Sequence, residues 1–452
     1  MFTRRALLGA SLVTLASGST RAEGENFVVW EAREGTAELL PHPAPATRIW
    51  GFEGRSPGPI LRVKLGQELR LRLTNKLPQN LAPLWRGMRL PNSVDGVKRP
   101  PMAQGESRDY VFTPPDVGLF LLQPSPLHGE ALSRGLAGLV IVEEPDPVFA
   151  HEELNLVLTD WRLGADAQLT PDFDHPADVL RQGRIGAVAT ANGAVRQVLE
   201  FAPGTRLRLR LANAASARMM TLGFDGPAPQ IFGVDGQFCD PFTPARKVLP
   251  LAPGARFDGV LDLSPLEGGR CRLILRGEAE LPDAVVLEIV TKGAARPPAP
   301  PLLPPKLNPL LPAEIHLEKA KRIELLIEGG IPASAPANYR PPGDLRQVWK
   351  INGKAGGLDG PPLFSVRAGT PVSLALVNKC LFPLAIFVQG HAMRLLHDLD
   401  DGWEPYWRDT VVAPEKTTKH VAFVADNPGQ WFLGDSIADH AAHGLAGWFE
   451  VT

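Results

Sequence analysis

The chain has 452 residues, enough for about three domains of ordinary size, and 44% of them are apolar. A charged fraction of 21% and a formal net charge of −2 exclude an acidic disordered chain. They also leave no basic field for nucleic acid, which is not expected as a partner. The 44 glycines and 46 prolines indicate many turns and few long helices, so the composition predicts a mostly β protein.

Residues 1–22 have the pattern of an export signal. Arg4 and Arg5 precede a short apolar stretch, and small residues up to Ala22 supply a cleavage site. Paired arginines before leucines favour a twin-arginine-type signal over an ordinary secretory one, so we expect export to the periplasm. Without its three arginines the mature chain has 44 basic and 49 acidic residues, a net charge of −5. No later apolar run is long enough for a membrane anchor.

Two sequence elements recur three times in the same order. The first is a turn glycine, an alternating strand and a final asparagine, at residues 63–75, 202–213 and 366–378. The second is a short turn followed by another strand, at residues 102–112, 251–263 and 412–424. Copies about 140 to 160 residues apart indicate three domains of one type.

The repeats and a proline-rich stretch divide the mature chain. Residues 296–312 begin with Arg-Pro-Pro-Ala-Pro-Pro and are predicted to form an extended linker. The predicted domains are residues 23–145, 146–295 and 313–452. Short alternating strands separated by turns predict an antiparallel sandwich in each domain, and the only helix we predict lies within residues 435–443.

Three cysteines, Cys239, Cys271 and Cys380, lie far apart in the sequence. Their odd number and the absence of a Cys-x-x-Cys pair predict buried, inert thiols rather than a metal site. One disulfide is the alternative in an oxidising compartment.

Several motifs resemble those of the multicopper oxidase superfamily. Residues 85–97 (WRGMRLPNSVDGV) and 112–118 (FTPPDVG) resemble its first domain, residues 158–161 (LTDW) its second, and residues 429–451 its last. The resemblance covers nearly the whole mature chain. It implies an all-β fold of three cupredoxin-like Greek-key β-sandwich domains in a multicopper-oxidase-like arrangement.

The copper-ligand positions of that family carry other residues here. Active members hold a trinuclear copper centre through eight histidines in four His-x-His pairs, and the corresponding positions are Leu84, Arg86, Gln123, Ser125, Phe387, Gln389, Gly434 and Ser436. At the mononuclear blue-copper site the positions are Leu384, Asp435, His440 and Leu445, so only His440 is kept. The chain has ten histidines and no His-x-His sequence, so no shift of the alignment restores a pair. We predict that no cofactor is bound, with copper as the alternative.

Arg86 is predicted to fill the vacated space between domains. A buried cation needs partners, and we expect a hydrogen bond to Gln123, Gln389 or Ser436. Two other groups are interpreted as packing or surface residues rather than metal sites: His440 with His443, and His391 with Met393 and His397.

The export signal, the cupredoxin-like domains and the missing ligands together resemble the SufI type of the superfamily, also called FtsP. The resemblance implies a periplasmic cell-division protein that protects the division machinery under stress. We predict a monomeric, non-enzymatic, copper-free binding or scaffold protein with no catalytic residues, whose partners are envelope or division proteins. The alternative is a multicopper-oxidase-type oxidoreductase with a reduced or relocated copper site.

Overall fold

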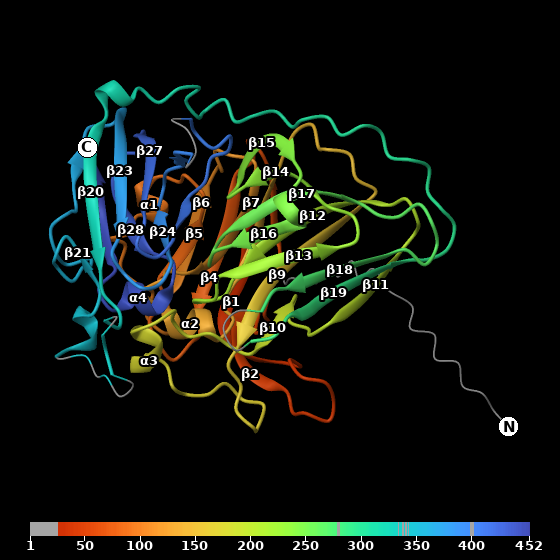
Figure 1. Ribbon diagram of the computed structural model, residues 1–452, viewed down its shortest axis with the longest axis horizontal. Helices are drawn as coiled ribbons and strands as arrows, with labels where there is room; N and C mark the ends of the chain where they lie inside the picture. Colours follow the sequence, from red (N-terminus) through yellow and green to blue (C-terminus); the bar gives the residue numbers. More distant parts are fainter. Residues whose placement is uncertain are drawn as a thin grey trace.

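Figure 1 shows the chain as three β-sandwiches in a computed structural model, with domain 1 (red and orange) between domain 2 (yellow and green) and domain 3 (blue) in this view. The structure describes residues 26–277, 281–332, 334–336, 339, 341, 343–397 and 402–452. The predicted export signal lies outside these residues. The described strands form six sheets, two in each domain, which confirms the predicted all-β sandwich fold. None of the described helices has the length and apolar character needed to cross a membrane.

Domain 1 packs two four-stranded sheets face to face. Alternate residues of each strand point inward, and the core between the sheets includes Trp30, Trp50 and Trp85. The first sheet contains, in order, β2 (Thr47–Phe52), β1 (Val28–Ala37), β4 (Leu69–Asn75) and β6 (Ser107–Phe112). The second contains, in order, β3 (Leu61–Lys64), β8 (Gly138–Glu143), β7 (Gly118–Pro124) and β5 (Pro83–Arg86). Two short helices, α1 (Asn92–Asp95) and α2 (Gly129–Ser133), lie in its connections.

Domain 2 packs a six-stranded sheet on a five-stranded one around a core of aliphatic side chains. The first sheet contains β10 (Val188–Ala191), β9 (Glu152–Trp161), β12 (Arg206–Asn213), β17 (Arg256–Asp262), β14 (Gln230–Val234) and β15 (Gln237–Phe242). The second contains β11 (Gln197–Phe201), β19 (Ala284–Thr291), β18 (Arg270–Leu275), β13 (Met220–Asp225) and β16 (Val248–Leu251). Helix α3 (Pro176–Val179) and the 3₁₀ turn η1 (Ala245–Lys247) lie between strands.

Domain 3 has two five-stranded sheets. The first contains β21 (Lys350–Ile351), β20 (Lys321–Glu328), β23 (Thr370–Asn378), β27 (Thr418–Ala425) and β25 (Arg394–Leu395). The second contains β22 (Ser365–Val366), β29 (Ala446–Val451), β28 (Gly429–Asp435), β24 (Leu384–Val388) and β26 (Thr410–Ala413). The predicted C-terminal helix is present as α4 (Ala438–Ala442). The 3₁₀ turn η2 (Leu317–Lys319) precedes β20, and the 3₁₀ turn η3 (Leu345–Gln347) lies between β20 and β21.

Two sequence predictions about local structure were wrong. The sandwiches are not purely antiparallel, because β1 pairs in parallel with β4, β9 with β12, and β20 with β23. Alternation of apolar and polar residues reports which face of a strand is buried and carries no information on the direction of its neighbour. The C-terminal helix is also not the only one, since α1, α2 and α3 have four or five residues each, too few to show a helical period.

The asparagines that end the first repeat element lie in the same structural setting in all three domains. Asn75, Asn213 and Asn378 are all 0% exposed. Each side-chain amide donates to carbonyl oxygens of the following loop and of the second repeat element, among them Met102, Leu251 and Ala413. Each Oδ1 accepts from the backbone N–H two residues further along. The two repeated sequence elements are therefore joined by one asparagine side chain in every domain.

The proline-rich segment 296–312 has no regular secondary structure and runs along the top of the molecule in Figure 1, from domain 2 to domain 3. Its path is held by hydrogen bonds to the two domains that it passes. Arg206 donates to the Pro300 carbonyl over 2.7 Å, and the Asn308 amide donates to Asp116 in domain 1 and Gln237 in domain 2 over 2.6 and 2.8 Å.

Cys239, Cys271 and Cys380 are buried free thiols, as predicted. Burial raises their pKa values to about 12, 11 and 12, so all three are protonated at neutral pH and unreactive.

Candidate functional site

The structure gathers the eight trinuclear positions where domain 1 meets domain 3. In domain 1, Leu84 of β5 pairs with Gln123 of β7, and in domain 3, Phe387 of β24 pairs with Gly434 of β28. Leu84 and Phe387 pack in one buried apolar cluster that spans the two domains. The positions from distant parts of the sequence are therefore brought together, as the resemblance implies.

Arg86 occupies the centre of this interface. Its side chain is 1% exposed, and its guanidinium group lies over the ring of Phe387, 3.6 Å from the ring centroid. Its Nη2 atom donates to Ser436 Oγ over 2.7 Å, to Thr410 Oγ1 over 2.6 Å and to the Pro253 carbonyl over 3.3 Å. The predicted bond to Ser436 is confirmed. Arg86 thus contacts domains 2 and 3 from its place in domain 1.

Gln389, a second expected partner of Arg86, bonds elsewhere. Its amide donates to the Asp95 carbonyl oxygen over 2.5 Å and to the Asp95 carboxylate over 3.1 Å, and its Oε1 accepts from the Phe432 N–H. The third expected partner, Gln123, has a buried Oε1 with no hydrogen-bond donor among the described residues.

A buried network of opposite charges surrounds Arg86. Asp409 Oδ1 lies 3.8 Å from Arg86 Nε, and Asp409 Oδ2 accepts from Arg256 over 2.5 Å. The backbone N–H groups of Arg256 and Asp409 both donate to Asp235. Burial lowers the pKa of Arg86 to about 10, with Asp409 opposing the shift, so the group remains cationic at neutral pH. Burial and the neighbouring Asp409 carboxylate raise the pKa of Asp235. Arg86, Arg256, Asp235 and Asp409 thus bring ionisable groups of all three domains together in a space closed to solvent.

Two glycines allow these arginines to approach the backbone. Gly254 has φ +82°, and a Cβ there would lie 2.6 Å from Arg86 Cζ. Gly87 has φ +87°, and a Cβ there would lie 2.2 Å from Arg256 Nη2. Both the conformation and the close contact require glycine.

Two of the blue-copper positions, Asp435 and His440, form a closed hydrogen-bonded unit. Asp435, at the cysteine position, and His440 are both 0% exposed, and Nδ1 of His440 lies 2.8 Å from Asp435 Oδ2. Nε2 of His440 lies 2.6 Å from the Arg181 carbonyl oxygen. Asp435 Oδ1 accepts from the N–H groups of Ala385 and Ile437. Both ring nitrogens of the kept histidine are therefore engaged by protein oxygens.

These residues do not fit copper. Leu84 and Phe387 at the trinuclear positions, and Leu384 and Leu445 at the mononuclear ones, offer carbon where the family offers imidazole, thiolate or thioether ligands. The His440 nitrogens point at Asp435 and a carbonyl oxygen, and the Arg86 cation lies over the ring of Phe387, at another of the trinuclear positions, where it would repel a cupric ion. Across the described ranges, no three His, Cys, Asp or Glu side chains are grouped as a metal site.

The other histidines proposed as weak metal candidates lie in packed surroundings. His391 and Met393 are 2% and 0% exposed, and the His391 ring contacts Phe423, Trp431 and Phe449. Burial lowers the pKa of His391 to about 4, so the ring is neutral. His443 Nδ1 lies 2.7 Å from the Asp439 carbonyl oxygen. These histidines are parts of the core and of the helix end.

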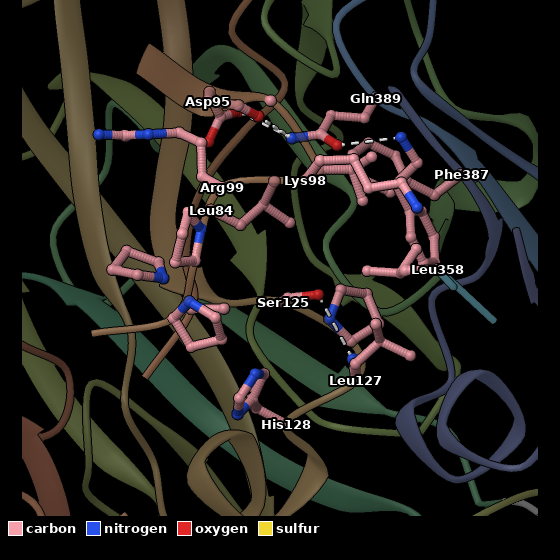
Figure 2. Close-up of a pocket in the computed structure, with 18 of the residues that line it drawn as sticks. Leu84, Asp95, Lys98, Arg99, Ser125, Leu127, His128, Leu358, Phe387 and Gln389 are labelled. Carbon is pink, nitrogen blue, oxygen red and sulfur yellow. Dashed lines mark hydrogen bonds between the residues drawn. The ribbon is translucent and has the colours of Figure 1, made fainter. Parts of the chain in front are cut away.

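Sequence reasoning missed Asp95, which lies beside Gln389 at one of the trinuclear positions. Figure 2 shows it at one end of a pocket of about 310 Å³, next to Gln389, with Ser125 and His128 at the other end. The side chain is buried, and its carboxylate accepts from the Trp85 N–H over 3.0 Å as well as from Gln389. Burial raises the pKa of Asp95 to about 7, against these bonds. Asp95 belongs to the first-domain motif at residues 85–97. The motif does not indicate which of its residues support the fold and which line a cavity.

Replacing Asp95 by asparagine is expected to change how stability depends on pH. The folded-state pKa is about 7 and the unfolded value about 3.9, so the folded protein binds more protons between these pH values and loses stability as pH rises. The free energy of unfolding of the parent, relative to Asp95→Asn, should fall by about 2 kcal/mol from pH 5 to pH 8. Urea unfolding at both pH values measures this.

Asp109→Asn provides the control for this prediction. The Arg72 guanidinium group holds the pKa of the exposed Asp109 carboxylate below its usual value, so this group does not titrate between pH 5 and 8. If the free energy of unfolding changed with pH in the same way in the parent and in Asp95→Asn, the raised pKa of Asp95 would be contradicted.

Comparisons with known proteins agree with this architecture. Two family models, each described as multicopper oxidase, match residues 34–147 and 331–452, together more than half of the chain. The crystal structure of a multi-copper oxidase from Pseudomonas thermotolerans superposes with a TM-score of 0.82 at 28% identity, covering 94% of this chain and 98% of that one.

Two relatives show the range of proteins that the chain is similar to. Multicopper oxidase MmcO of Mycobacterium tuberculosis is 25% identical over 98% of this chain and 96% of its own length. Cell division protein FtsP of Xenorhabdus nematophila is 32% identical over 49% of this chain and 47% of its own length, so that match spans about half of each protein. With family models matched at both ends and the fold shared along its length, the chain belongs to the multicopper oxidase superfamily.

Proposed function

We propose that this member of the superfamily binds no copper and acts as a binding or scaffold protein rather than as an oxidase. The observation that carries the proposal is the buried cation of Arg86. Its guanidinium group lies 3.6 Å from the Phe387 ring centroid and 2.7 Å from Ser436 Oγ. All three residues stand at positions that the family uses for trinuclear copper ligands. A fold does not keep an activity when the groups that perform the chemistry are replaced.

We propose that the place of action is the cell envelope and that the partners are envelope or division proteins. The similarity to cell division protein FtsP from several bacteria supports this role, over about half of the chain. The twin-arginine-type pattern of residues 1–22 supports export to the periplasm in the folded state.

Metal content tests the copper-free proposal. The mature chain is produced in medium with added copper, purified and dialysed, and its copper is measured together with its absorption in the blue-copper band. A multicopper oxidase with all its ligands, produced in parallel, is the positive control. We expect less than about a tenth of a copper per chain and no visible band, because no intact ligand set remains. Near-stoichiometric copper that survives dialysis would contradict the proposal.

The second candidate function is an oxidoreductase with a reduced or relocated copper site. His440, kept at a blue-copper position with His443 three residues later, is the observation that favours it. Copper at His440 would have to break its contacts with Asp435 and with the Arg181 carbonyl oxygen, which weighs against this candidate. Oxidation assays on phenols and metal ions would follow only if copper is retained.

A further inference from the structure

Another pocket lies where the proline-rich linker passes domains 1 and 2. Its volume is about 410 Å³, within the range of ordinary small-molecule sites. Domain 1 contributes Leu65 and residues 115–117 to its walls, and domain 2 contributes Phe238 of β15. The two connections between domains, residues 144–146 and 305–310, complete the walls. A ligand in this pocket would therefore contact both domains and the linker at once.

The lining of this pocket is mostly apolar. Its apolar side chains and prolines are Leu65, Pro115, Val117, Pro145, Phe238, Pro305, Leu307, Pro309 and Leu310. Three of these leucines are unusually accessible, since Leu65 is 38%, Leu307 56% and Leu310 57% exposed. An apolar molecule in the pocket would remove these leucine side chains from water, which favours its binding.

The two acidic side chains deepest in the lining already have cationic partners. Asp116, whose side chain is 1% exposed, pairs with Arg89 over 2.7 Å. Glu144, whose side chain is 9% exposed, pairs with Arg208 over 2.8 Å. Neither carboxylate therefore needs a cationic ligand to compensate its burial.

The other polar side chains of the lining are also engaged. Asp146 and Lys306 pair with each other over 2.5 Å, and they are 72% and 87% exposed, so water surrounds both. The Asn308 amide donates to two side chains, and its Oδ1 accepts from the Leu310 N–H. These bonds also hold the linker wall in place, so the pocket is formed before a ligand arrives.

We propose that this pocket binds a compact, neutral, apolar organic molecule, such as a fused aromatic ring, between Phe238 and the linker leucines Leu307 and Leu310. An ionic ligand would find each charged group of the lining already paired, so nothing would replace the hydration that the ion loses. The inference goes beyond the proposed function and is independent of it, because no residue of this lining stands at a copper-ligand position.

Binding of three matched compounds to the mature protein tests this inference. 2-Naphthylmethanol, 2-naphthoate and 2-naphthylmethylamine share one apolar body and are neutral, anionic and cationic at pH 7. Titration followed by ligand-detected NMR is expected to show that the alcohol binds at least about tenfold more tightly than either ion, because only the ions must lose charge hydration. Equal affinities for the three compounds, tighter binding of either ion, or no binding of the alcohol would overturn the inference.

Two leucines of the linker test the location. Leu307→Asp places a charge in the apolar wall and should weaken binding of the alcohol about tenfold or more. Leu303→Asp is the matched control, because Leu303 is a 75% exposed leucine of the same linker outside the lining, and it should leave the affinity unchanged. Equal affinities of the two variants for the alcohol would overturn the inference.

The exposed leucines could instead serve to dock the protein on a membrane. Sedimentation with phosphatidylcholine vesicles distinguishes this use from a small-molecule site, and we expect the protein to stay in the supernatant. Vesicle binding that Leu307→Asp abolishes and Leu303→Asp preserves would overturn the inference in favour of a membrane surface.

Discussion

Replacing Arg86 by alanine is expected to lower the free energy of unfolding by about 3 to 5 kcal/mol. The change removes the cation beside Asp409 and the donor to Ser436, Thr410 and the Pro253 carbonyl, and leaves a cavity over the Phe387 ring. Urea unfolding of variant and parent at pH 7, followed by tryptophan fluorescence, measures the loss.

Two further variants separate the causes. Arg86→Met removes the charge but keeps most of the bulk over Phe387, so it should cost less than alanine because it leaves a smaller cavity. Asp409 keeps its bond to Arg256 in both variants. Arg72→Ala removes an exposed arginine of the same domain, paired with Asp109 over 2.7 Å, and should cost at most about 1 kcal/mol. An Arg86→Ala variant as stable as Arg72→Ala would mean that the buried network contributes nothing to the joining of the three domains.

The three repeated strands and the burial of Arg86 could be predicted from the sequence. The recurring glycine, alternating strand and asparagine are local patterns, and each corresponds to a strand that ends at Asn75, Asn213 or Asn378. The burial of Arg86 and its bond to Ser436 also follow from the sequence, because a guanidinium group at an interdomain position must find partners there.

The charged residues around Arg86 could not be predicted from the sequence. Asp235, Arg256 and Asp409 stand in no motif and are far apart along the chain, and only the packing of three domains brings them to one point. Asp95 is a similar case, since burial raises its pKa and one of its hydrogen-bond partners, Gln389, reaches it from domain 3. Interfaces between domains are set by tertiary structure, so local patterns do not report them.

The buried asparagines give the second large expected effect. Asn75→Ala should lower the free energy of unfolding by about 3 kcal/mol or more, because the variant leaves the Leu77 N–H and the carbonyl oxygens of Gln79 and Met102 without their side-chain partner in a buried place. Asn75→Asp keeps the shape but turns an acceptor towards the two carbonyl oxygens, so it should cost at least as much at neutral pH.

Asn80→Ala is the matched control, since Asn80 is an exposed asparagine five residues later in the same domain, and its replacement should change stability by about 0.5 kcal/mol or less. Because the same bonds recur at Asn213 and Asn378, alanine at either position should cost a similar amount. If Asn75→Ala were no more destabilising than Asn80→Ala, the three asparagines would only mark where strands end. A large loss at all three would instead show that one side chain per domain holds the repeated elements together, which is a physical reason for the same pattern to recur three times in one chain.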